Sequence, residues 1–167
     1  DPFCPTLSRL LADEGERLMS EGRQLHRDGI YLAMEGPAFS TRAESNLYRS
    51  WGCKVIGMTN HTEARLAREA EIAYASLSMV TDYDCWNTSH GNVTVEMVIE
   101  NLKANAELAT QIVKSAAEKI SSSKPISKAH SALKEGLITP KEKVPIPTRE
   151  KLDIFTSPYW GKVQQKH

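Results

Sequence analysis

The chain has 167 residues, of which 40% are hydrophobic and 25% are charged, a composition typical of a globular domain with one core. Its 21 basic side chains balance 21 acidic ones, which argues against a nucleic-acid backbone or an anionic membrane as a partner. No apolar stretch approaches the ~20 residues that cross a bilayer, which argues against a membrane span.

The hydrophobic pattern switches repeatedly between the helical period and short apolar runs that are typical of buried strands. A capping box at Thr41 and Glu44 predicts where one helix begins, and Gly52 predicts where it ends. This alternation predicts an α/β fold, with a mixed and largely parallel sheet flanked by helices. We expect helices over 6–21, 41–51, 60–71, 94–120 and 127–135, and strands over 29–35, 54–58 and 72–80.

The composition changes after the long helix, so we divide the chain into an α/β unit over 1–120 and a C-terminal extension over 121–167. The extension is rich in Lys, Pro and Ser. We predict that it wraps the core or a neighbouring subunit, with Phe155, Tyr159 and Trp160 as anchors. The alternative that its composition suggests is a loosely ordered tail.

An acidic motif, TDYDCW at residues 81–86, follows the third expected strand. In extended backbone, residues i and i+2 point the same way, so Asp82 and Asp84 can face one ligand while Tyr83 points away. Two carboxylates held close together do not both ionise easily, and such a pair can accept from an amino group and donate to a ring nitrogen. The alternative is an acidic turn in water, because Asp is common in turns.

Two further polar junctions follow the first two expected strands. Thr59 lies between a strand and a helix N-terminus, where free N–H groups favour an anion, although it could equally serve as a helix cap. Phe39 follows Gly36-Pro37, and its ring is suited to stack on a flat heterocycle unless it packs in the core. Because ligands of open α/β sheets bind beyond the carboxyl ends of the strands, we expect the three junctions to form one site.

Together, the three junctions resemble those of the S-methyl-5′-thioadenosine phosphorylases, which have the purine nucleoside phosphorylase fold. The segment EGPAFSTRAES at 35–45 is similar to that family's purine-binding segment, and GMT at 57–59 is similar to its ribose and phosphate segment. TDYDCW is similar to its adenine-recognition loop, and the opening DPFCP also matches a family segment. The resemblance covers residues 1–120 and implies the same fold.

The resemblance implies phosphorolysis of S-methyl-5′-thioadenosine to adenine and 5-methylthioribose 1-phosphate, a step of purine and methionine salvage. It implies a pentosyltransferase that uses inorganic phosphate as co-substrate, needs no cofactor or metal, and forms a homotrimer or a higher assembly. Asp82 and Asp84 are the implied catalytic residues, and Thr59 is the implied phosphate ligand. The other substrate contacts that the resemblance implies are Phe39, Ser40, Met58, Thr81, Val95, Val98 and Ile99.

Two alternatives stand beside this hypothesis. A phosphorylase for 6-oxopurines is disfavoured, since such relatives usually carry Asn in place of Asp82. A non-catalytic fragment that serves assembly or ligand binding is the alternative from another class. Because the family's other phosphate-binding segments lie upstream of the matching region, we expect an N-terminal polypeptide of the same enzyme to be required. Three cysteines without metal-ligand spacing favour a reducing, cytoplasmic location.

Overall fold

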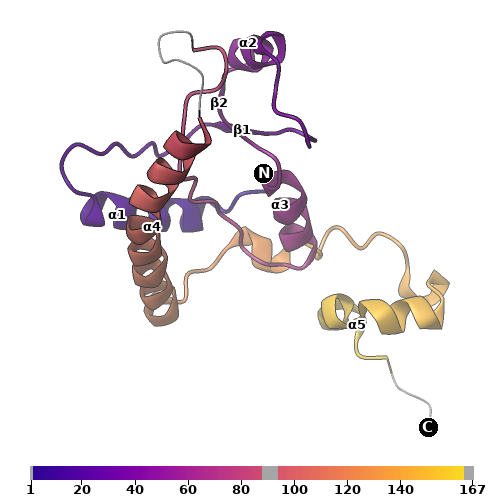
Figure 1. Ribbon diagram of the computed structural model, residues 1–167. Helices are drawn as coiled ribbons and strands as arrows, with labels where there is room; N and C mark the ends of the chain where they lie inside the picture. Colours follow the sequence, from indigo (N-terminus) through magenta and orange to yellow (C-terminus); the bar gives the residue numbers. More distant parts are fainter. Residues whose placement is uncertain (1, 88–93, 164–167) are drawn as a thin grey trace.

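The computed structural model of the chain describes residues 2–87 and 94–163 (Figure 1). Asp1, the first residue of the opening segment that matches the family, lies outside them. None of the helices within these two stretches combines the length and the apolar character that a membrane crossing needs. The elements are α1 Pro5–Leu18, β1 Ile30–Ala33, α2 Arg42–Ser50, β2 Cys53–Gly57, α3 Asn60–Glu69, α4 Val95–Ser123, the 3-10 turns η1 Lys128–Ser131 and η2 Lys141–Lys143, and α5 Ile146–Trp160.

Strands β1 and β2 pair in parallel, with α2 between them in the chain, which confirms the predicted alternation. Ala33 pairs with Gly57, so both strands end at the same edge of the sheet. Beyond that edge, the Met34 N–H donates to the Gly57 carbonyl at 2.8 Å. The hydroxyl of Tyr31 lies directly beside Gly57, where a Cβ atom would clash with it, so a side chain at position 57 would force the Tyr31 side chain to move.

The long helix α4 packs across α1, and Figure 1 shows the two helices crossing to one side of the sheet. Ala12 on α1 and both Ile112 and Ala116 on α4 are buried. Gly15 leaves room for Leu25 of the segment after α1, because a Cβ atom there would lie 3.1 Å from a methyl carbon of Leu25, and it also faces Ile112 of α4. These small and branched side chains form an apolar contact between two elements that are distant in the sequence.

A carboxylate is buried at the same helix crossing. Glu14 has no exposed surface, and its Oε2 accepts from Arg17 Nη2 at 2.7 Å and from Ser115 Oγ at 2.6 Å. Lys119 forms an ion pair with the other carboxylate oxygen. A buried charge is tolerated only when it is paired and hydrogen-bonded, and Glu14 satisfies both conditions with partners from α1 and α4.

The strand expected over 72–80 is wrong, since within the described ranges only β1 and β2 form a sheet. This segment instead makes separate hydrogen bonds to other parts of the molecule. The Cys4 N–H donates to the Tyr74 carbonyl at 2.7 Å, and Asn105 Nδ2 donates to the Val80 carbonyl at 3.2 Å. A strand needs a row of backbone partners, whereas single bonds from the start of α1 and from α4 hold this segment.

Residues 121–163 contain α5, which the sequence reasoning missed in favour of one helix over 127–135. That shorter stretch forms only the 3-10 turn η1. Helix α5 has Pro147 in its first turn and is followed by Gly161, whose φ is +73°; both are ordinary start and stop signals. Figure 1 shows α5 at a distance from the sheet. A loosely ordered tail is therefore the wrong description of this part.

Glu71 binds two residues that lie far later in the chain. Its Oε1 accepts from the Leu133 N–H at 2.9 Å and from the Tyr159 hydroxyl at 2.5 Å. The hydrogen bond to this carboxylate raises the pKa of Tyr159. Tyr159 thus contacts a residue far earlier in the chain, whereas Phe155 is 40% exposed and Trp160 lines a cavity beside α5.

The Glu14 cluster predicts a pH-dependent stability. Hydrogen bonds from Lys119, Ser115 and Arg17 lower the pKa of Glu14 from 4.5 to about 2. A carboxyl group whose pKa falls on folding stabilises the protein above its unfolded-state pKa, and this contribution disappears as the pH falls through the folded-state value. We expect Glu14→Gln to unfold at lower urea concentration than wild type at pH 7, and the difference to shrink between pH 4.5 and pH 2.

The control is Glu118→Gln, which removes an exposed carboxylate from the same helix α4 and should leave the urea midpoint unchanged. Equal midpoints for wild type and Glu14→Gln at pH 7 would show that the buried charge contributes nothing to stability.

Candidate active site

The segments that follow β1 and β2 meet where the two strands end. Gly36 has a φ of +69°, and a Cβ atom there would lie 3.2 Å from Met58 Sδ, so the Met58 side chain packs against this turn. Phe39 follows the turn with its side chain 88% exposed, and Met58 is 38% exposed. Core packing of Phe39 is therefore wrong in this structure, and its ring is open to a flat ligand.

The acidic loop lies against the first of these segments. Cys85 Sγ donates to the Ser40 carbonyl at 3.3 Å, and Arg42 Nε donates to the Cys85 carbonyl at 3.3 Å. Residues 39–42 and 81–86 are thus held side by side, although they lie 43 to 45 positions apart in the chain. The structure brings together the three junctions that the sequence analysis expected at one edge of the sheet.

The two acidic side chains make hydrogen bonds within their own loop. Asp82 is exposed, and its Oδ2 accepts from Thr81 Oγ1 at 2.6 Å. Asp84 is half-buried, and its Oδ1 accepts from the Cys85 N–H at 2.8 Å. The Asp84 carbonyl also accepts from the Asn87 N–H at 3.0 Å, which closes a turn. The loop therefore has the turn geometry expected of an acidic turn, and it also carries two carboxylates close in sequence to Cys85, the residue that contacts Ser40.

Thr59 is the N-cap residue of α3, but its side chain makes no capping hydrogen bond. Its backbone carbonyl accepts from the Glu63 N–H at 3.4 Å, which begins the helix. The role of Thr59 as a side-chain cap is therefore wrong. Its exposed hydroxyl stands beside the positive end of α3, in a position suited to an anion.

The first turn of α4 carries the three apolar candidates. Val98 is half-buried, whereas Val95 is 70% exposed and Ile99 is 43% exposed. One and two turns further along, Asn101 donates to the Thr81 carbonyl and Asn105 donates to the Val80 carbonyl. These bonds attach α4 to the start of the acidic loop, so the three apolar side chains lie on the helix that supports it.

Sequence reasoning missed the polar side chains that fix the acidic loop. Besides the two asparagines of α4, they include Arg42 and Arg49 of α2, and the Arg49 guanidinium carbon lies 3.6 Å from the centroid of the Trp86 ring. Their spacing is a weak sequence signal, because the two arginines are seven positions apart, the two asparagines are four apart, and such positions share one face of a helix. It does not reveal which loop that face meets.

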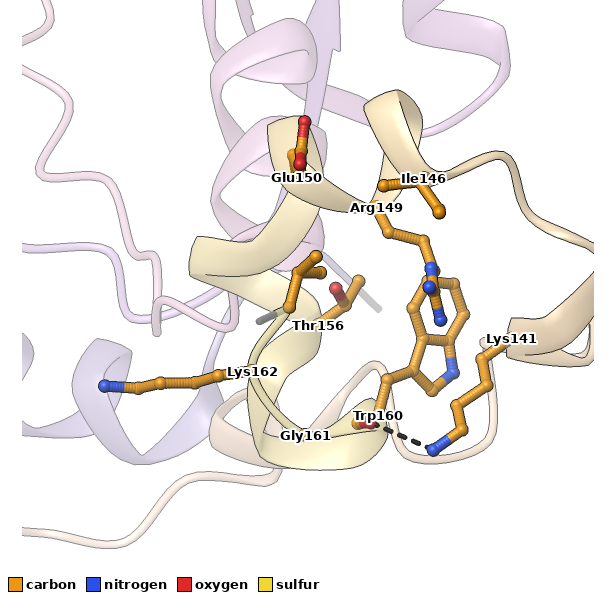
Figure 2. A pocket seen from close by; sticks show the side chains of 9 residues that line it. Lys141, Ile146, Arg149, Glu150, Thr156, Trp160, Gly161 and Lys162 are labelled. Atoms are coloured by element: carbon orange, nitrogen blue, oxygen red, sulfur yellow. Dashed lines mark hydrogen bonds between the residues drawn. The ribbon is translucent and has the colours of Figure 1, made fainter. Parts of the chain in front are cut away.

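A cavity of about 380 Å³ lies at α5, away from these segments (Figure 2). Figure 2 shows Lys141, Arg149 and Trp160 grouped on one side of it, and Lys141 Nζ donates to the Trp160 carbonyl at 3.3 Å. None of the residues predicted for the site lines this cavity. The predicted residues instead lie on the segments that follow β1 and β2, on the acidic loop and on α4.

The fold and the residues at the sheet edge agree with the comparisons to known families. Residues 1–118 match the family model described as Phosphorylase superfamily, and the chain belongs to that family.

Individual relatives in this family that match the chain include two proteins with the same name. The chain is 72% identical to an S-methyl-5′-thioadenosine phosphorylase of Prochlorococcus marinus, over 97% of the chain and 52% of the relative. It is 54% identical to the protein of that name from Thermosynechococcus vestitus, over 95% of the chain and 55% of the relative. The chain thus spans about half the length of the curated relatives it matches.

The chain is also similar in structure to solved methylthioadenosine phosphorylases. A methylthioadenosine phosphorylase from an antarctic soil metagenomic library matches with a TM-score of 0.86 and 43% identity, over 93% of this chain and 54% of that one. The Schistosoma mansoni methylthioadenosine phosphorylase in complex with adenine matches with a TM-score of 0.63 and 30% identity, over 72% of this chain and 47% of that one. The α/β architecture is therefore the phosphorylase fold.

The two threonines that precede α2 and α3 should contribute unequally to stability. Thr41 forms a complete capping box with Glu44, so Thr41→Val should lower the free energy of unfolding by about 1 kcal/mol. Thr59 makes no capping bond, so Thr59→Val should change it by less than about 0.5 kcal/mol. Urea titrations of both variants measure the contrast, and an equal loss in the two would mean that Thr59 caps α3 after all.

Proposed function

We propose that the enzyme containing this chain phosphorolyses S-methyl-5′-thioadenosine to adenine and 5-methylthioribose 1-phosphate. The observation that carries the proposal is the meeting of the three family-like segments at one edge of the sheet, in a chain 72% identical to a protein of that activity by name. The enzyme is then a pentosyltransferase of purine and methionine salvage that uses inorganic phosphate and needs no cofactor or metal.

The chemistry assigns a separate task to each part of the site. As the bond between C1′ and N9 breaks, its electron pair moves to the purine while a phosphate oxygen forms the new bond to C1′. A proton delivered at N7 stabilises the charge that develops on the leaving purine. We assign this proton to Asp82 and the hydrogen bond from the 6-amino group to Asp84. Thr59 holds the phosphate, which its exposed and uncapped hydroxyl supports.

The remaining candidates would enclose the substrate. Phe39 would stack on the base, which its open ring supports, and Met58 would lie beneath the ribose next to the Gly36 turn. Ser40 and Thr81 would line the base pocket. Val95, Val98 and Ile99 would surround the methylthio group, which suits an apolar substituent because burial of apolar surface is favourable.

The architecture supports the partners that we propose. Parallel sheets are normally covered on both faces and extended by further strands, whereas the described residues supply two short strands. We propose that an N-terminal polypeptide of the same enzyme completes the sheet and the phosphate site, and that the enzyme forms a homotrimer. We further propose that residues 1–120 form the α/β unit and 121–167 an extension of it. The free thiols of Cys4, Cys53 and Cys85 support a cytoplasmic location.

Base specificity tests the reaction. We expect the complete enzyme to have a higher kcat/KM for S-methyl-5′-thioadenosine than for inosine, because two carboxylates can accept from an exocyclic amino group. Asp82→Asn should lower the adenine-releasing rate by about 10²-fold or more, the scale of general-acid catalysis. Asp28→Asn, an exposed acid outside the site, serves as the control. A preference for inosine would favour the 6-oxopurine alternative, and no turnover of either would favour a non-catalytic protein.

Phosphate affinity tests the role of Thr59. In the complete enzyme, Thr59→Val should raise the KM for phosphate far more than the KM for the nucleoside, because the variant loses a hydroxyl donor beside a helix N-terminus. Thr59→Ser, which keeps the hydroxyl, is the matched control and should stay close to wild type. Unchanged constants in Thr59→Val would show that the phosphate lies elsewhere.

A further inference from the structure

We propose that Arg49 of α2, together with Asn101 and Asn105 of α4, are positioning residues that hold the acidic loop in the orientation that meets the purine. The purine part of this inference rests on the proposed function. None of the three touches the reacting atoms in the assignment above, and each acts through the loop that carries Asp82 and Asp84.

The carboxyl end of the loop is held by α2. The Arg49 guanidinium carbon lies 3.6 Å from the centroid of the Trp86 ring, well inside the range in which a cation is attracted to an aromatic face. Arg42 Nε adds a hydrogen bond to the Cys85 carbonyl at 3.3 Å. Helix α2, which carries both arginines, is itself well anchored, because it begins with a complete capping box and buries Ser45.

The amino end of the loop is held by α4. Asn101 Nδ2 donates to the Thr81 carbonyl at 2.5 Å, and Asn105 Nδ2 donates to the Val80 carbonyl at 3.2 Å. The segment from 72 to 87 belongs to no strand in the described structure, so no ladder of backbone bonds fixes it. The two amide side chains take over that function for consecutive carbonyls.

The two attachments leave a short span between them. Only residues 82–85 separate Thr81 from Trp86, and both acidic side chains lie within this span. The Tyr83 ring also meets the Trp86 ring edge to face, with centroids 6.0 Å apart. Release of either end would let the carboxylates shift, and a misplacement of about 1 Å at a reacting group can cost about 10²-fold in rate.

The kinetic test uses the complete enzyme. Arg49→Met keeps the length of the side chain but removes the cation, and Arg49→Lys keeps the charge but loses the planar group. We expect kcat/KM for the nucleoside to fall by about tenfold to 10²-fold in Arg49→Met and by less in Arg49→Lys, with the KM for phosphate within about twofold of wild type. Asn101→Leu should reproduce the effect from the other end. Arg65→Met, an exposed arginine of α3, is the matched control.

Hydrogen–deuterium exchange of the loop amides gives a readout that does not depend on turnover. We expect faster exchange over 81–87 in Arg49→Met and Asn101→Leu, but not in Arg65→Met. This result, together with a lower kcat/KM for the nucleoside and a nearly unchanged KM for phosphate, would support the inference. Unchanged exchange would overturn it, and so would faster exchange with wild-type nucleoside constants. If the wild-type enzyme fails to phosphorolyse any nucleoside, the proposed function is wrong, and the exchange rates alone then decide whether these side chains hold the loop.

Discussion

The parallel pairing of Ala33 with Gly57 is the contact on which the candidate site depends. It ends both strands at one edge and brings the Gly36 turn against Met58. A shift of the pairing by one residue would turn the side chains of one strand to the opposite face and separate these two segments. The register of two short strands therefore determines whether the ribose, base and phosphate candidates share one place.

The sequence predicted best the elements whose ends carry local signals. Thr41 and Glu44 begin α2 by contacts within a single turn, and Thr94 Oγ1 begins α4 by accepting from the Met97 N–H at 3.3 Å. The wrong strand over 72–80 has a different cause. An apolar run indicates burial, but a strand is defined by partners elsewhere in the chain. Helix α5 was missed because the Lys- and Pro-rich composition drew more weight than the positions of Pro147 and Gly161.

In the candidate site, too, local motifs could be predicted from the sequence, whereas contacts between distant segments could not. Residues such as Asp82, Thr59 and Phe39 were predicted as site residues because each belongs to a short motif placed after an apolar run. The supporting side chains of α2 and α4 carry no such motif. Arg49 is an ordinary polar residue on a helix surface, and its meaning depends on Trp86, 37 positions away, reaching the same place. Contacts of this kind arise from packing and cannot be read from either segment alone.

The meeting of Tyr31 with Gly57 has a consequence for how this sheet can vary among homologous proteins. The phenol of one strand occupies the space that a side chain on the neighbouring strand would need. Two positions 26 residues apart are therefore linked by volume: a side chain in place of the glycine fits only if the tyrosine side chain turns away or a shorter residue replaces it. In an alignment, the pair should change together, and a chimaera that combined the larger residue of each parent would push the strand ends apart at the point where the nucleoside is expected to bind.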